Sequence, residues 1–217
     1  MTFLFLAFII AAIIVLTFIA FRFKAFSSSK PILAAVAIAG LFNLLLFIIF
    51  NKQGILTFQH EYLSNVNVSG IPVEPILLSF VLPYALLVIY MALNVAFPFV
   101  KADKYSLSIS NMIMGLSIAM IFFAYDKGLA IITFSLLLLT LFYVEYKSRL
   151  RFMLHFYRAY AAALIVFLLI FIPENQLSIY NYTAAQTIEL KLAYIPFESY
   201  FTFLWISLVA IFSFEYF

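Results

Sequence analysis

The stretch Ile71-Pro72-Val73-Glu74 has a second copy later in the chain, Ile195-Pro196-Phe197-Glu198. Each copy follows a polar loop and leads into a long apolar segment, and two further apolar segments precede each loop. Self-similarity of this kind indicates an internal repeat, which decides how the whole chain is arranged. We therefore predict that the chain contains two copies of a three-helix unit.

The composition excludes a water-soluble protein. Of the 217 residues, 67% are hydrophobic, 20% aromatic and 10% charged, and the mean hydropathy is +1.17. Soluble domains contain roughly 45–50% apolar and about 25% charged residues, and a soluble fold of this size cannot bury so much apolar surface. Soluble nucleic-acid-binding domains and soluble dinucleotide-binding enzymes are therefore excluded. The chain has no cysteine, so it has no disulfides and no thiolate chemistry.

Seven segments are apolar and long enough to cross a bilayer as helices, which takes about 20 residues. They are residues 3–21, 32–50, 76–97, 107–124, 129–144, 156–172 and 194–214. We therefore predict an all-α integral membrane fold with seven transmembrane helices.

The basic residues divide unevenly between the two sides that seven spans define, nine against three. Because loops rich in Lys and Arg stay in the cytoplasm, we predict a protein of the bacterial inner membrane with its N-terminus outside and its C-terminus cytoplasmic. The nine predicted cytoplasmic residues are Arg22, Lys24, Lys30, Lys101, Lys104, Lys147, Arg149, Arg151 and Arg158, and the three predicted outer residues are Lys52, Lys127 and Lys191.

The repeat also predicts how the spans are organised. Repeat one covers about residues 1–98, a linking helix about 99–127, and repeat two about 128–217. Upstream of the motif, residues 50–53 are similar to 173–176, and downstream 89–91 align with 213–215. Corresponding helices are four spans apart, so the two three-helix repeats are parallel and related by an axis along the membrane normal. Both motif glutamates then lie at the same depth on the outer side, where they can face one central pocket.

The motif places a carboxyl at the start of each helix. With Pro72 and Pro196 as first helical residues, the glutamates occupy the third position, where the helix dipole favours a carboxylate by roughly 0.3–1 kcal/mol. Burial has the opposite effect and favours the neutral acid. A facing pair of buried carboxyls tends to share one proton, which suits acid–base chemistry. The simpler alternative is a pair of helix-capping glutamates, and Pro75 disfavours a helical conformation at Glu74.

These segments resemble the membrane lycopene cyclase domain family of bacteria, archaea and fungi, a fused two-repeat type of carotenoid cyclase. The resemblance rests on the first motif with Leu82-Pro83-Tyr84-Ala85, and on Asn181, the second motif and Phe214-Glu215-Tyr216. It implies a lycopene β-cyclase-like enzyme that converts linear ends to β-rings by redox-neutral acid–base isomerisation. It implies Glu74 and Glu198 as the catalytic pair, with Glu215 in support. The residues that it implies for substrate binding are Pro72, Tyr84, Asn181 and Pro196.

The chain departs from the family pattern, as a divergent member would. The family usually has a second acidic residue directly after each motif glutamate, but this chain has Pro75 and Ser199 there. The family also has an acidic residue near the end of the third span, at the position of Met91 in this chain. The implied partners are a polyene such as lycopene, membrane lipid, and a second copy or other carotenoid-pathway enzymes. No cofactor, metal or nucleic acid is implied.

Two other functions remain open. The first is a non-catalytic carotenoid-binding or cyclase-assembly subunit that has lost acidic groups. The second is a transporter, because paired glutamates at a repeat interface can bind ions, although both lie nearer the surface than the midplane. A retinal photoreceptor is excluded because no lysine falls in mid-membrane. Asn43 lies inside the second span, where packing is its simplest role and a pocket is the alternative.

Overall fold

The computed structural model describes residues 10–11, 13–15, 17–18, 22, 29–59, 63, 66–68, 70–98, 103–148 and 150–217. The long helices in this part of the chain are α2 (Ser29–Lys52), α3 (Val73–Ala96), α4 (Asp103–Phe123), α5 (Gly128–Phe142), α6 (Met153–Gln176) and α7 (Phe197–Tyr216). A π-helical turn, η3 (Tyr143–Lys147), continues α5, and a short 3-10 turn, η4 (Ala184–Gln186), follows α6.

All six long helices are apolar and long enough to span a membrane, as an all-α integral membrane protein requires. They coincide with the second to seventh predicted spans. The first predicted span, 3–21, lies outside the described residues except for a few isolated helical positions. The last helix begins at Phe197 rather than at residue 194 as predicted, because the residues before it form a strand.

Six short strands of the described residues lie at one end of the helices. Strand β1 (Leu56–Phe58) pairs antiparallel with β4 (Tyr180–Tyr182), β2 (Asn67–Val68) with β3 (Ile71–Pro72), and β5 (Lys191–Leu192) with β6 (Ile195–Pro196). Because β1 closely follows α2 and β4 closely follows α6, the pairing of β1 with β4 shows that α2 and α6 end on the same side.

The local structure before α3 is repeated before α7. Thr57 and Asn181, which lie opposite each other, are 124 positions apart. The same separation relates β2–β3 to β5–β6, and Gly54 (φ 67°) to Ser178 (φ 54°). The predicted match of residues 50–53 with 173–176 is therefore wrong by one position. The backbone N–H groups of Ile55 and Ile179 donate to Phe50 and Glu174, which makes Phe50 the counterpart of Glu174.

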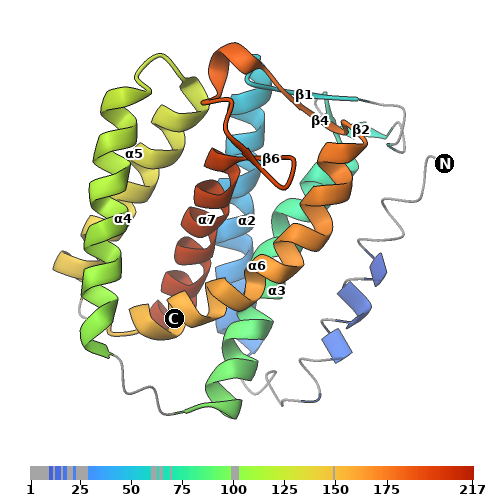
Figure 1. Cartoon of the computed structure of the whole chain (residues 1–217). Helices are drawn as coiled ribbons and strands as arrows, with labels where there is room; N and C mark the ends of the chain where they lie inside the picture. Colours follow the sequence, from blue (N-terminus) through green and yellow to red (C-terminus); the bar gives the residue numbers. More distant parts are fainter. Residues whose placement is uncertain are drawn as a thin grey trace.

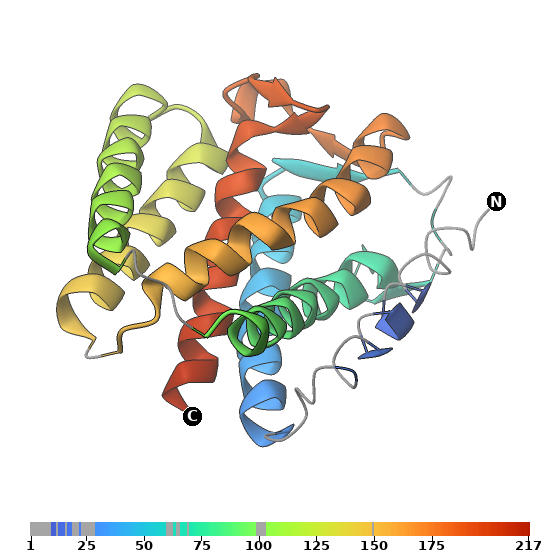
Figure 2. The ribbon, with the colours of Figure 1, turned by 60° about the horizontal axis from the view of Figure 1, so that its bottom comes forward.

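Helix α7 occupies the middle of the bundle, where it packs against α2, α3, α5 and α6 (Figures 1 and 2). Helix α4 is attached through α5 and, more weakly, α6. Hydrogen bonds cross the α5–α7 contact, with Thr133 Oγ1 2.9 Å from Thr202 Oγ1, and Trp205 Nε1 donating to Thr140 Oγ1 at 2.9 Å. The close approach of α2 to α3 depends on Gly40, because a Cβ there would lie 2.3 Å from Cδ1 of Phe80.

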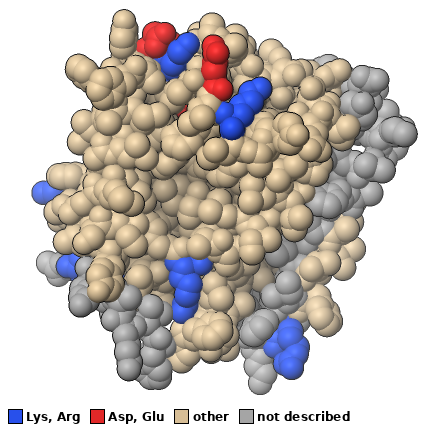
Figure 3. All heavy atoms as spheres, viewed as in Figure 1, with Lys and Arg blue, Asp and Glu red and all other residues tan. Residues whose placement is uncertain are grey.

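Charged side chains lie toward the ends of the helices. In the view of Figure 3 the visible acidic side chains gather at the end that carries the hairpins, whereas Lys and Arg appear towards both ends. Most of the surface between them carries no charged side chain in this view, as expected for a lipid-facing belt.

Candidate functional site

The two motif glutamates occupy equivalent, fully buried positions. Helices α3 and α7 begin at Val73 and Phe197, directly after Pro72 (φ −59°) and Pro196 (φ −55°). Glu74 and Glu198 are therefore the second helical residues, not the third as predicted, and both are 0% exposed.

Pro75 is compatible with the start of α3. The expectation that Pro75 disfavours a helical conformation at Glu74 is not met, because Glu74 is helical and buried in the first turn. Pro75 itself is tolerated there because N–H groups in the first turn have no intrahelical acceptor, so a proline removes no helix hydrogen bond.

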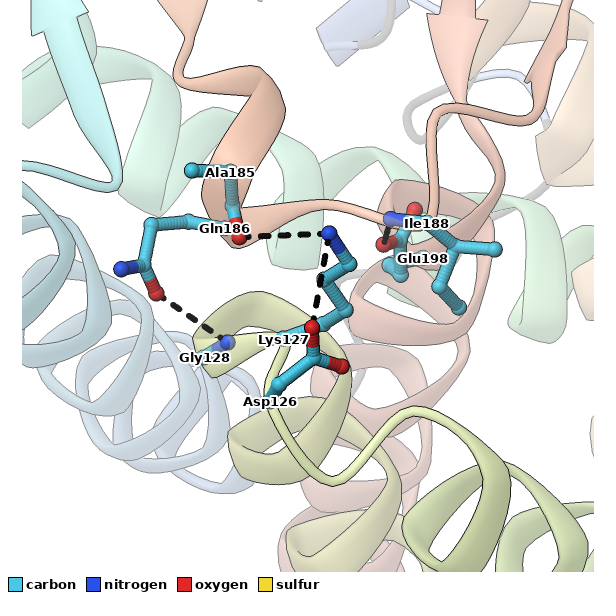
Figure 4. A network of polar contacts seen from close by, with 7 residues as sticks. All are labelled: Asp126, Lys127, Gly128, Ala185, Gln186, Ile188 and Glu198. Carbon is cyan, nitrogen blue, oxygen red and sulfur yellow. Dashed lines mark hydrogen bonds and ion pairs between the residues drawn. The ribbon is translucent and has the colours of Figure 1, made fainter.

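The loop after β4 covers Glu198 (Figure 4). The N–H of Ile188 donates to Glu198 Oε1 at 2.7 Å, and Oε2 is buried without a hydrogen-bond partner among the described residues. The same loop is attached to the start of α5, where Gly128 N–H donates to Gln186 Oε1 at 3.2 Å and Lys127 Nζ to Ala185 O at 3.4 Å. The covering loop therefore holds one oxygen of the carboxyl and leaves the other without a hydrogen bond from the described residues.

A cavity of about 40 Å³ lies inside the bundle below the hairpins. At roughly 10–15 Å³ for one water molecule, its volume equals that of about three waters, and its lining is largely apolar and aromatic. Its lining residues are Asn43, Leu46, Phe47, Phe50, Leu56, Leu82, Leu129, Phe167, Phe171, Tyr182, Ser199, Thr202, Phe203 and Ile206.

The prediction that both motif glutamates face one central pocket does not hold for this cavity, because neither glutamate lines it. On α7 the residue after the motif, Ser199, reaches the cavity instead. Successive helical residues point about 100° apart, so Ser199 faces the cavity while Glu198 faces the covering loop. Ser199 Oγ donates to the Tyr182 hydroxyl over a long 3.5 Å, and Tyr182 lines the cavity too. Ser199 and Tyr182 therefore connect the Glu198 region to the cavity.

Several carboxyl groups affect the pKa values of two tyrosines of β4. Burial raises the pKa of Tyr182 to about 12; the Ser199 hydrogen bond lowers it, and the charges of Glu174 and Glu198 raise it. Burial likewise raises the pKa of Tyr180, with further contributions from Glu174, Tyr182 and Glu74. The tyrosines of β4 therefore lie within electrostatic reach of both motif glutamates and of Glu174, which the sequence analysis did not select.

The other predicted site residues are more dispersed. Pro72 and Pro196 are buried beside the glutamates, whereas Asn181 is exposed. Tyr84 is partly buried further along α3, with its hydroxyl 3.2 Å from Thr17 Oγ1.

Glu215 is not brought together with the other glutamates. It is 17 residues after Glu198 in α7, about 25 Å away at 1.5 Å per residue, and it accepts a hydrogen bond from Tyr90 at 2.5 Å. The predicted supporting role of Glu215 in the same site does not fit this distance.

Asn43 and Glu174 are two further buried polar residues in this part of the bundle. Asn43 is 6% exposed and lines the cavity, and Glu174 is 1% exposed in the last turn of α6. The sequence places Glu174 beside a proline and an asparagine, which is typical of a solvated loop, so only its burial identifies it. Among the described residues no three His, Asp or Glu side chains are grouped as metal ligands would be.

The comparison with known families decides the assignment of the chain. The family described as lycopene cyclase matches residues 1–93 and 126–217. The chain belongs to the lycopene cyclase family. At the level of the family, this membership supports a carotenoid cyclase-like function. It also implies a polyene carotenoid substrate in the membrane. No curated protein and no solved structure matches the chain.

The two matched stretches of this lycopene cyclase family member also show its internal repeat. Helix α4 lies in the unmatched residues between them. Each stretch carries one Ile-Pro-x-Glu motif with its preceding hairpin.

Proposed function

We propose that this protein is a carotenoid end-group cyclase of the lycopene β-cyclase type, with Glu74 and Glu198 as its acid–base pair. The observation that carries the proposal is the burial of two repeat-equivalent glutamates in a member of this family, one of which, Glu198, directly precedes a residue that lines an aromatic cavity. We further propose two parallel three-helix repeats joined by α4, with the hairpins on the outer side of a bacterial inner membrane.

The reaction needs one proton donor and one acceptor and no redox partner. The acid protonates the terminal double bond, which forms one C–H bond and leaves a carbocation. The electron pair of a nearby double bond then forms the C–C bond that closes the ring. Loss of a proton from the ring to the base leaves its C–H electron pair as the new double bond. Each of two carboxyl groups can perform one of the two transfers.

The cavity suits the cationic stage of this reaction. Its walls carry several aromatic rings, including Phe167 and Phe203, whose centroids are 4.7 Å apart. The faces of aromatic rings attract cations, and an apolar chamber excludes the water that would quench a carbocation.

The cavity is small in this structure. Ligand pockets usually measure about 300–1,000 Å³, far more than the 40 Å³ of this cavity. A carotenoid end group therefore requires the lining side chains to move apart as it enters from the lipid.

The test is expression in a lycopene-accumulating bacterial host with chromatographic analysis of the pigments. We expect cyclic carotenoid from the wild-type chain and at least about 100-fold less from Glu74→Gln or Glu198→Gln, the usual loss when a general acid or base is removed. Glu189→Gln is the matched control, because Glu189 is an exposed glutamate of the covering loop.

Each outcome separates the proposal from its alternatives. Lycopene that remains linear while bound to well-folded wild-type protein would favour a carotenoid-binding or assembly subunit. Equal cyclisation by all three variants would show that the motif glutamates are helix caps rather than catalytic groups.

A further inference from the structure

A third buried carboxyl lies next to the cavity, outside the repeated motif. Glu174 follows Phe167 and Phe171 on α6 at spacings of i+7 and i+3, which places the three side chains on one face of the helix. Both phenylalanines line the cavity. Glu174 therefore stands one turn beyond the cavity, toward the hairpins.

Glu174 is also chemically unusual. It is 1% exposed, and neither of its carboxyl oxygens has a hydrogen-bond partner among the described residues. A buried carboxylate without donors is costly, so such a group is held as the neutral acid. A neutral carboxyl can accept a proton on one oxygen and release its own from the other.

The neighbours of Glu174 extend toward both motif glutamates. Tyr182 lies within electrostatic reach of Glu174 and Glu198, and Tyr180 within reach of Glu174 and Glu74. Tyr180 also stacks on Phe171, with ring centroids 6.1 Å apart. Glu174 therefore shares Tyr182 as a neighbour with Glu198, and Tyr180 with Glu74.

The proposed isomerisation creates a need for such a group. After one ring has formed, the glutamate that acted as acid has lost a proton and the glutamate that acted as base has gained one. Before the next ring can form, this proton has to return, and the cavity has room for only a few waters.

We propose that Glu174 returns the proton between the two motif glutamates. It accepts the proton from the glutamate that deprotonated the ring, while its own proton leaves toward the glutamate that protonates the next double bond. No oxidant or other reactant is required. Glu174 is then a proton relay that acts through Glu74 and Glu198 rather than on the substrate. This inference rests on the proposed cyclase function.

The experiment compares the first turnover with steady turnover of lycopene by purified protein in detergent. We expect Glu174→Gln to form the first ring within about 2-fold of the wild-type rate but to lower steady turnover by about 10-fold or more, because only the return step is impaired. Glu174→Asp should recover most of the steady rate, and the exposed Glu189→Gln should match wild type.

A second measurement on the wild type covers the case in which Glu174→Gln does not fold. Over many turnovers in deuterium oxide, internal return predicts fewer than one deuterium per ring at the newly protonated carbon. One deuterium per ring overturns the inference.

The remaining outcomes are equally decisive. An equal fall of both rates in Glu174→Gln, or no fall in either, also overturns the relay while the cyclase assignment stands. Failure of the wild-type chain to form any ring overturns the proposed function together with the relay.

Discussion

Thr57 of β1 lies directly opposite Asn181 of β4, the residue that is its counterpart in the second repeat. The flanking pairs have the same symmetry. Leu56 lies opposite Tyr182, the counterpart of Phe58, and Phe58 lies opposite Tyr180, the counterpart of Leu56. Antiparallel pairing of equivalent residues is what a two-fold axis through this point produces. The two halves are thereby joined at the end of the bundle where the buried glutamates lie.

The orientation in the membrane can be tested with single cysteines, because the chain has none of its own. Glu189 and Lys147 are exposed at opposite ends of the bundle. In spheroplasts we expect an impermeant thiol reagent to label Glu189→Cys and to label Lys147→Cys only after permeabilisation. The opposite pattern would invert the proposed topology.

The contact between α2 and α3 predicts a stability defect. Gly40→Ala places a methyl group against the ring of Phe80, and overpacking of this kind costs about 1–3 kcal/mol. We expect a lower thermal unfolding midpoint in detergent. Gly115→Ala is the control, since no neighbouring atom lies within 4 Å of the place that its added methyl group would take. An unchanged midpoint for Gly40→Ala would mean that the ring simply rotates away.

The two motif glutamates should act as one unit. If they serve as acid and base of a single reaction, Glu74→Gln with Glu198→Gln should lose about as much activity as either single variant, because removing one partner already stops the proton transfers. Pigment analysis of the three strains at equal protein levels measures this. Losses that multiply would indicate independent roles.

The aromatic cavity wall should contribute to rate rather than only to packing. Phe203 lines the cavity, and Phe203→Leu removes the face of its ring. An aromatic face stabilises a desolvated cation by about 1–2 kcal/mol. We therefore expect the cyclisation rate to fall roughly 5- to 30-fold. Phe142→Leu, at a 51% exposed position, is the control. Equal cyclisation by Phe203→Leu would assign that ring to packing alone.

Tyr182 should make the fold sensitive to alkaline pH. Its pKa is raised to about 12, whereas an unfolded tyrosine titrates near 10. The folded state therefore keeps a proton that the unfolded state loses. The resulting stability is fully present below about pH 10 and is lost as the pH rises through about 12, by roughly 1.4 kcal/mol per pH unit in between.

The unfolding midpoint in detergent, followed from pH 9 to 12, measures this effect. Tyr182→Phe should show a shallower decline than wild type. Tyr125→Phe, at a 75% exposed position, controls for the loss of one tyrosine. Parallel declines of all three proteins would remove Tyr182 as a cause.

Several features of this protein follow from the sequence alone. Composition and segment length identify a helical membrane protein, and the duplicated Ile-Pro-x-Glu motif identifies the repeat and two of the buried acids. These features are readable because hydrophobicity, proline and the motif are properties of short stretches of chain.

The tertiary structure alone decided which helix faces meet in the bundle. In a membrane, the lipid and the protein interior are similarly apolar, so a helix that is apolar all round carries no mark of its buried face. For this reason the sequence analysis predicted that Glu198 faces the cavity, whereas Ser199 lines it. It also did not select Glu174, which is buried although its neighbours in the sequence are typical of a loop.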